Sequence, residues 1–138
     1  MPPTVTLPII GALRTPYATL ADIPRQAALN PDAIGRAELY PEYAPGLANL
    51  EEFGRIWLYF LFDQATATDM IVRSRKEGRP MGVFATRSPA RPARLGVSLV
   101  ELVSVEGSTV TFKGVDMLDN TPLLDIKPYI EDLPPASL

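Results

Sequence analysis

The stretch GVSLVELVSVEGSTVTFKGV, residues 96–115, decides the fold of this chain. Its two halves, 97–105 and 109–115, are rich in β-branched and other apolar residues, and they flank the short turn Glu106-Gly107-Ser108. Two such runs on either side of a glycine-containing turn predict a β-hairpin. The fold is therefore expected to be organised around a pair of long antiparallel strands.

Short apolar runs separated by glycine and proline continue along the rest of the chain. The 15 prolines among 138 residues favour strands and turns over long helices, because proline interrupts helical hydrogen bonding. The expected strands are 6–14, 35–39, 55–62, 81–85, 96–106, 109–115 and 123–127. A short helix is expected at 45–53, with another helical turn near 66–74. About seven short strands predict a mostly β protein, a barrel or a sandwich.

Composition narrows the possible functions. The length of 138 residues suits one domain, expected at 1–132 with a frayed tail at 133–138. The chain has no cysteine and no histidine, which excludes disulfides, thiolate metal sites and histidine-based catalysis. We expect no metal site. No apolar run approaches the roughly 18 residues of a membrane span, and no signal peptide is evident, so a cytoplasmic location is expected.

The basic residues are unevenly distributed in a chain whose net charge is −3. Seven of the 13 lie between positions 73 and 94, against one acid, Glu77. These seven are Arg73, Arg75, Lys76, Arg79, Arg87, Arg91 and Arg94. A local basic patch on an acidic body predicts one anionic ligand at one place. The alternative interpretation is a solvated loop.

Two stretches carry side chains suited to anionic or polar ligands. In Pro24-Arg25-Gln26, a proline-restricted backbone holds a guanidinium and an amide, which suit a base edge or an amino-acid head group. Arg87 directly follows an expected strand, so a rigid element would position its guanidinium for a carboxylate or phosphate. The plainer alternatives are a polar turn for the first stretch and an ordinary ion pair for Arg87.

Two later stretches carry carboxylates. In the segment 116–119, two aspartates flank Met117 and Leu118 and suit ribose hydroxyls or a cationic ligand; the alternative is an Asx turn at Asp119. Asp125 and Lys127 share one face of an expected strand. They form either a catalytic pair or a structural ion pair, and composition alone favours the ion pair.

Taken together and in this order, these stretches resemble the TsaA-like family, the N-terminal domain of the TrmO methyltransferases. The motifs GVFATRSP, residues 82–89, and LDIKPY, residues 124–129, are the most specific. The other matching segments are 24–26, 47–53 with the strand around Trp57, Arg91-Pro92, 96–102 and 116–122. The resemblance covers nearly the whole chain. It departs from the family pattern at Asp63, where the family has histidine, and at Asn120, which tolerates the same left-handed backbone as the family's glycine.

The resemblance implies a small closed β-barrel with one or two short helices. It further implies a homodimer that binds S-adenosylmethionine near its interface and methylates N6 of threonylcarbamoyladenosine in tRNA. The implied cofactor-binding residues are Pro24, Arg25, Gln26, Asp63, Gln64, Arg87, Val97, Asp116, Met117, Leu118 and Asp119. The implied catalytic residues are Asp125, Lys127 and Tyr129, with Asp125 as the hypothetical proton acceptor.

Contact with RNA is implied for Arg73, Arg75, Lys76, Arg91 and Arg94. Methyl transfer from a sulfonium depends mainly on positioning, so the absence of histidine is compatible with this chemistry. Two alternatives remain. The chain methylates an acceptor other than tRNA, or it is a non-catalytic module that binds S-adenosylmethionine or a partner.

Overall fold

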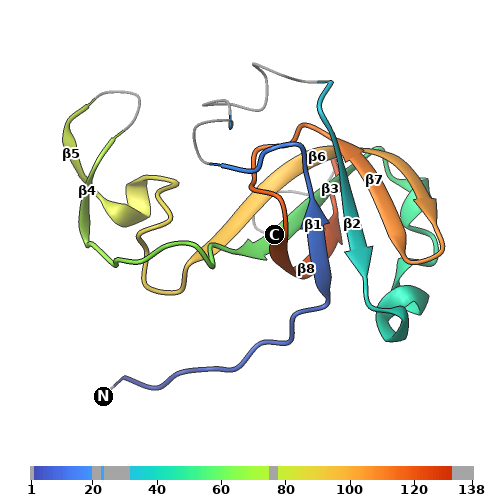
Figure 1. Cartoon of the computed structure of the whole chain (residues 1–138), viewed down its shortest axis with the longest axis horizontal. Helices are drawn as coiled ribbons and strands as arrows, with labels where there is room; N and C mark the ends of the chain where they lie inside the picture. Colours follow the sequence, from blue (N-terminus) through green and yellow to red (C-terminus); the bar gives the residue numbers. More distant parts are fainter. Residues whose placement is uncertain (1, 20–22, 24–31, 75–77, 132–138) are drawn as a thin grey trace.

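Six antiparallel strands close into a barrel in the computed structural model of this chain (Figure 1). The structure describes residues 2–19, 23, 32–74 and 78–131. The barrel strands are β1 (Gly11–Arg14), β2 (Ile34–Leu39), β3 (Arg55–Leu61), β6 (Leu95–Glu106), β7 (Thr109–Lys113) and β8 (Thr121–Pro128). Their order around the barrel is β1-β2-β7-β6-β3-β8. The predicted mostly β barrel is thus confirmed.

The hairpin predicted from residues 96–115 forms the longest part of this barrel. Glu106 pairs with Thr109, and Gly107 between them adopts a left-handed φ of 61°. A register shift between Leu102 and Ser104 bends β6, so that its two halves pair with β3 and β7. This bend allows one strand of 12 residues to pair with a neighbour on each side as the barrel closes.

The barrel interior is a continuous apolar core made by alternate residues of each strand. Leu13, Ile56, Leu58, Val110 and Phe112 are fully buried in it. Gly35 is required beside the largest of these side chains, because a Cβ at this position would lie 2.6 Å from Cζ of Phe112. Burial of the apolar face by period-two alternation is what sets the strand register.

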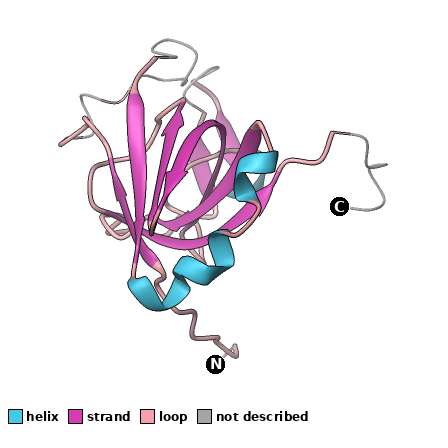
Figure 2. Cartoon of the chain, turned by 90° about the vertical axis from the view of Figure 1, so that its right-hand side faces the viewer, coloured by secondary structure: helices cyan, strands magenta, loops and turns pink. Residues whose placement is uncertain are grey.

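The remaining elements differ in part from the expected ones. The predicted short helix near 45–53 is confirmed as helical structure, but it is divided into two 3-10 helices, η3 (Pro41–Leu47) and η4 (Leu50–Glu52), which pack beside the barrel (Figure 2). The interruption follows from Pro45, which lacks a backbone N–H, and from Asn49, which has a φ of 71°. The first strand occupies only Gly11–Arg14 of the expected 6–14.

Between β3 and β6 the chain leaves the barrel as an arm, which we define as residues 66–94 (Figure 1). The arm contains the two-stranded sheet of β4 (Ile71–Arg73) and β5 (Pro80–Gly82), followed by the 3-10 helix η5 (Val83–Ala85). The helical turn expected near 66–74 is thus strand β4, and the strand expected at 81–85 is mostly η5. These short apolar runs pair locally because no barrel strand is left open to them.

We expect Gly96→Ala to destabilise the fold by about 1–3 kcal/mol through overpacking. Gly96 is buried opposite Phe60, and a Cβ at this position would lie 2.2 Å from Cε2 of that ring. The free energy of unfolding in urea measures the effect. Gly54→Ala is the matched control, because its Cβ would meet nothing within 4 Å. Equal stability of the two variants would contradict the prediction.

Candidate functional site

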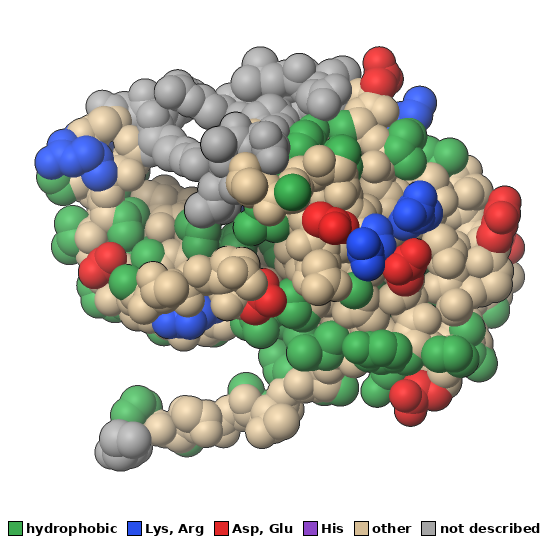
Figure 3. All heavy atoms as spheres, viewed as in Figure 1, with side chains coloured by type: hydrophobic (Ala, Val, Ile, Leu, Met, Phe, Trp, Pro, Cys, Tyr) green, Lys and Arg blue, Asp and Glu red, His purple; other side chains and the backbone are tan. Residues whose placement is uncertain are grey.

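A cavity of about 1020 Å³ lies where the arm meets the end of the barrel. Its walls come from the end of β3, the following residues 62–65, the loop 85–91, the start of β6 and the segment 116–118. Figure 3 shows the arm standing off from the barrel across a hollow, with basic and hydrophobic side chains on the arm. Segments that are far apart in sequence thus converge on one concave site, as ligand sites commonly do.

The loop 85–91 is held rigid by hydrogen bonds of its own polar side chains. Thr86 donates its hydroxyl to the carbonyl of Val83 at 2.9 Å and accepts from the N–H of Ser88 at 3.2 Å. Nη1 of Arg91 donates to the carbonyls of Thr86, at 2.9 Å, and Ser88, at 3.1 Å. The motif at 82–89 therefore forms a fixed cavity wall, and the two hydrogen bonds from Arg91 stabilise the conformation of that wall.

Arg87 is the guanidinium that this wall presents to the cavity. Its Nη2 donates to the carbonyl of Val97 on β6 at 2.8 Å, which ties the loop to the barrel. The side chain is exposed and lines the cavity. Since a guanidinium carries five N–H donors, this single bond leaves most of them available to a carboxylate or phosphate.

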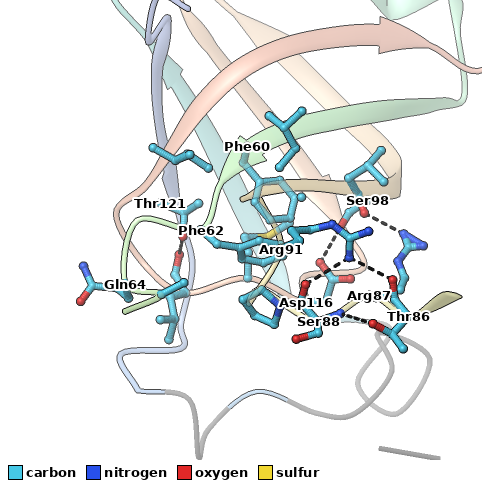
Figure 4. Close-up of a pocket in the computed structure, with 18 of the residues that line it drawn as sticks. Phe60, Phe62, Gln64, Thr86, Arg87, Ser88, Arg91, Ser98, Asp116 and Thr121 are labelled. Carbon is cyan, nitrogen blue, oxygen red and sulfur yellow. Dashed lines mark hydrogen bonds between the residues drawn. The ribbon is translucent and has the colours of Figure 1, made fainter. Parts of the chain in front are cut away.

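Asp116 lies near Arg87 on the lining of the same cavity (Figure 4). Its Oδ1 accepts a hydrogen bond of 2.6 Å from the hydroxyl of Ser98, a serine that is only 4% exposed on β6. Burial raises the pKa of the Asp116 carboxyl; the Ser98 hydrogen bond and the charge of Arg87 oppose this rise. Among the described residues no cation lies within ion-pair distance of Asp116. The Asp116 carboxyl is thus held in place by Ser98 without a direct cationic partner.

The raised pKa of Asp116 predicts a pH-dependent stability. In the unfolded chain this carboxyl titrates near 3.8, so the folded protein holds the proton more tightly. The stability contributed by the protonated form is complete below that pH and is lost as pH rises through the folded-state pKa. We expect Asp116→Asn to gain stability relative to the wild type as pH rises above about 4, through the range in which the folded carboxyl loses its proton. Urea unfolding across this range measures the difference, and a constant difference would argue against the assignment.

The rest of the cavity is largely apolar. The rings of Phe60 and Phe62 meet edge to face with centroids 5.5 Å apart, and buried Met117 adds to this wall together with Leu118 (Figure 4). The lining includes the predicted residues Asp63, Gln64, Arg73, Arg87, Val97, Asp116, Met117 and Leu118. Sequence reasoning missed Phe60, Phe62 and Ser98. The signal for Ser98 was a serine at an inward position of an otherwise apolar strand.

Asp119 and Arg94 do not line the cavity. Oδ1 of Asp119 accepts from Nε of Arg14 and from the backbone N–H of Thr15, each at 3.0 Å, and these contacts lower the pKa of its carboxyl, the Thr15 bond most of all. Arg94 has a φ of 54°, and its Nη1 donates to the carbonyl of Ala65 at 2.7 Å. Both side chains thus brace segments that border the cavity.

Asp125, Lys127 and Tyr129 lie on the outer side of β8 or just beyond it, and none lines the cavity of its own chain. Oδ1 of Asp125 accepts from the neighbouring backbone N–H of Ile126 at 2.8 Å. Nζ of Lys127 lies 5.9 Å from the ring centroid of Tyr59. Among the described residues no ion pair joins Asp125 to Lys127, so the ion-pair interpretation is wrong.

Five predicted residues lie outside the described part of the chain: Pro24, Arg25, Gln26, Arg75 and Lys76. Their roles stay predictions. In the described segments, no group of three or more acidic side chains is arranged to hold a metal ion. Nor does any helix there have the length and apolar character needed to cross a membrane.

A closed antiparallel barrel with a fixed arginine, a half-buried carboxylate and aromatic walls around one cavity defines a small barrel-type ligand-binding domain. Comparison with known proteins identifies the family to which this domain belongs. The chain belongs to the family described as the tRNA-methyltransferase O N-terminal domain, whose model matches residues 12–133. The expected family membership is confirmed.

Several known proteins share this domain. The chain is 42% identical to a probable S-adenosyl-L-methionine-binding protein of Pyrococcus abyssi, over 89% of this chain and 67% of that protein. It is 39% identical to the tRNA (adenine(37)-N6)-methyltransferase of Escherichia coli K12, over 93% and 60%. A crystal structure of TrmO from Pseudomonas aeruginosa superposes with a TM-score of 0.78 at 38% identity, over 94% and 56%. The chain thus spans little more than half of the latter two proteins.

Proposed function

We propose that this chain binds S-adenosylmethionine in the cavity and transfers its methyl group to N6 of threonylcarbamoyladenosine in tRNA. The observation that carries the proposal is a cavity with aromatic walls that both Arg87 and Asp116 line, within segments that match the family. The printed names of the relatives support the cofactor and the class of substrate. Action on tRNA also favours a cytoplasmic location.

The residues of the cavity fit the parts of this cofactor. Arg87 suits its carboxylate, since a guanidinium pairs with carboxylates through parallel hydrogen bonds. Phe62, Met117 and Leu118 offer an apolar wall to its purine. Asp116 offers an anion to its ribose hydroxyls or its cationic groups. When bound, S-adenosylmethionine supplies a methyl group already activated by a positively charged sulfur.

We further propose that the chain forms a homodimer through the outer face of β3, β6 and β8. Trp57, Tyr59 and Leu99 share this face, and the ring of Tyr129 packs against Trp57 with centroids 6.1 Å apart. In contrast, the outer faces of β1, β2 and β7 carry Arg14, Arg36, Glu38, Thr111 and Lys113. An aromatic sheet face of this kind is typical of a protein interface.

A dimer through this face would explain the position of Asp125, Lys127 and Tyr129. Asp125 pairs with Tyr59, which pairs in turn with Val97 at the cavity edge, so the aromatic face borders the cavity. We propose that these three side chains complete the cavity of the partner. There Asp125 would accept the proton that N6 loses as the new carbon–nitrogen bond forms, and Lys127 and Tyr129 would shape the reaction pocket.

The cationic surface beside the cavity would hold the tRNA. Arg73 is exposed at the cavity edge. Arg91 and Arg94 donate one nitrogen each to backbone carbonyls, and each guanidinium retains further N–H donors for phosphates. The RNA contacts predicted for Arg75 and Lys76 concern residues outside the described part of the chain. Contacts of this kind lose affinity steeply as salt rises.

Titration calorimetry with S-adenosylmethionine, followed by transfer of a labelled methyl group to tRNA, tests the proposal. We expect binding, and transfer to tRNA that carries threonylcarbamoyladenosine but not to tRNA with unmodified adenosine. Binding without transfer to any RNA preparation would indicate a binding module or a different acceptor. No binding would reject the proposed cofactor site.

A further inference from the structure

The arm carries an apolar surface that its own packing leaves open. Phe84 is 77% exposed, Ile71 64% and Met70 50%, although Val83 beside Phe84 is 1% exposed. The N–H of Val83 donates to the carbonyl of Met70 at 2.8 Å, which brings η5 against the start of β4. Single exposed apolar side chains are ordinary, but three on adjoining segments form a surface that suits a ligand.

Phe84 is presented rigidly and beside the cavity. It lies in η5 between Val83, which anchors the arm, and Ala85, which begins the cavity wall. The backbone N–H and the hydroxyl of Thr86 both bond the carbonyl of Val83, at 3.1 and 2.9 Å, and this closes the turn around Phe84. An exposed ring held in this way is ready to bind with little loss of conformational freedom.

The arm that carries the ring is rich in cationic residues. The described part of the arm contains five arginines, at positions 73, 79, 87, 91 and 94, against one acid, Asp69. The chain as a whole is net negative, so the arm is the region that attracts an anion. A partner that is both flat and anionic fits an exposed ring on an arginine-rich arm, which describes an unpaired nucleotide. A second copy of the arm is a less favourable partner, because it would bring arginines of like charge against each other.

We propose that Phe84 stacks on the unpaired base next to the acceptor adenosine in an RNA loop. This inference rests on the proposed function. To reach the cavity, the acceptor base must leave the stack of its neighbours, which uncovers the face of an adjacent base. A ring fixed one residue before the cavity wall can cover that face and hold the strand in register. Phe84 is thus a positioning residue for RNA, separate from the cofactor contacts.

The test uses the full chain and a fluorescein-labelled RNA hairpin with an adenosine in its unpaired loop. Fluorescence anisotropy gives the RNA affinity across a series of salt concentrations, and calorimetry gives the affinity for S-adenosylmethionine. We expect Phe84→Ala to weaken RNA binding by about tenfold, within the usual range for one stacked base. The cofactor affinity and the slope of RNA affinity against salt should stay unchanged, because no cation is lost.

Aromatic replacement separates stacking from simple apolar contact. Phe84→Trp should bind RNA as the wild type does, whereas Phe84→Leu should behave like Phe84→Ala. Equal rescue by leucine, or unchanged RNA affinity in Phe84→Ala, would overturn the stacking role and leave the proposed function intact. A change in the molecular mass of Phe84→Ala by light scattering would place the ring in an interface between copies and also overturn it. Failure of the wild type to bind the hairpin at any salt would also overturn the stacking role, while methyl transfer to tRNA tests the proposed function separately.

Discussion

Arg87→Ala is expected to lose binding of S-adenosylmethionine by about ten- to a hundredfold. A charge-assisted hydrogen bond contributes roughly 1.5–3 kcal/mol, and removal of the guanidinium leaves the carboxylate of the cofactor without its partner. Arg87 is the exposed cation on the cavity wall, and its position is set by the bond to the carbonyl of Val97. Titration calorimetry measures the loss directly.

Two further variants sharpen this experiment. Arg36→Ala removes a guanidinium from the polar side of the barrel, where Nε lies 3.9 Å from Oε2 of Glu38, and it should bind the cofactor normally. Arg87→Lys keeps the charge but loses the planar fork, so it should recover only part of the affinity. Wild-type affinity in Arg87→Ala, with the fold intact by circular dichroism, would remove Arg87 from the cofactor site.

Mixing two inactive variants is expected to restore activity if the partner completes each cavity. Arg87→Ala and Asp125→Asn should each lack methyl transfer alone. In a two-fold symmetric dimer, half of the randomly formed dimers are mixed, and one of their two cavities has both residues intact. The mixture should therefore reach about a quarter of the wild-type rate. Transfer of a labelled methyl group after subunit exchange measures the recovery.

The matched control mixes Arg87→Ala with Asp116→Asn. These two residues line the same cavity of the same chain, so every cavity in that mixture lacks one of them. No recovery is expected there. Absence of recovery in the Arg87–Asp125 mixture, with dimers present by light scattering, would mean that Asp125 does not act across the interface. A monomeric wild type would reject the proposed dimer.

Local sequence determined the barrel strands well, for a physical reason that acts over a few residues. The turn at Gly107 needs a left-handed backbone, and β-branched runs on both sides favour extended pairing, so the hairpin was predictable. Asn120 likewise has the left-handed φ, 65°, that its residue type tolerates. Of the basic residues clustered between 73 and 94, Arg73, Arg87 and Arg91 line the cavity.

Only the tertiary structure determined the different roles of the charged side chains of Asp116 and Asp119. Asp116 and Asp119 are three positions apart, yet one faces the cavity with Ser98 while the other bonds Arg14 and Thr15 at the end of the neighbouring strand β1. No sequence pattern distinguishes them, because the partners lie 18 to 105 positions away and are brought close only when the barrel closes.

The structure of the arm also could not be predicted from local sequence. Its apolar runs have strand-like composition, but the barrel is closed without them, so they pair with each other or form η5 instead. Sequence therefore determined the chemistry that is available near the site: arginines, carboxylates and one exposed ring. Closure of the barrel determined which of these face the cavity, which brace its walls and which remain on the outer surface, because each orientation depends on long-range strand register.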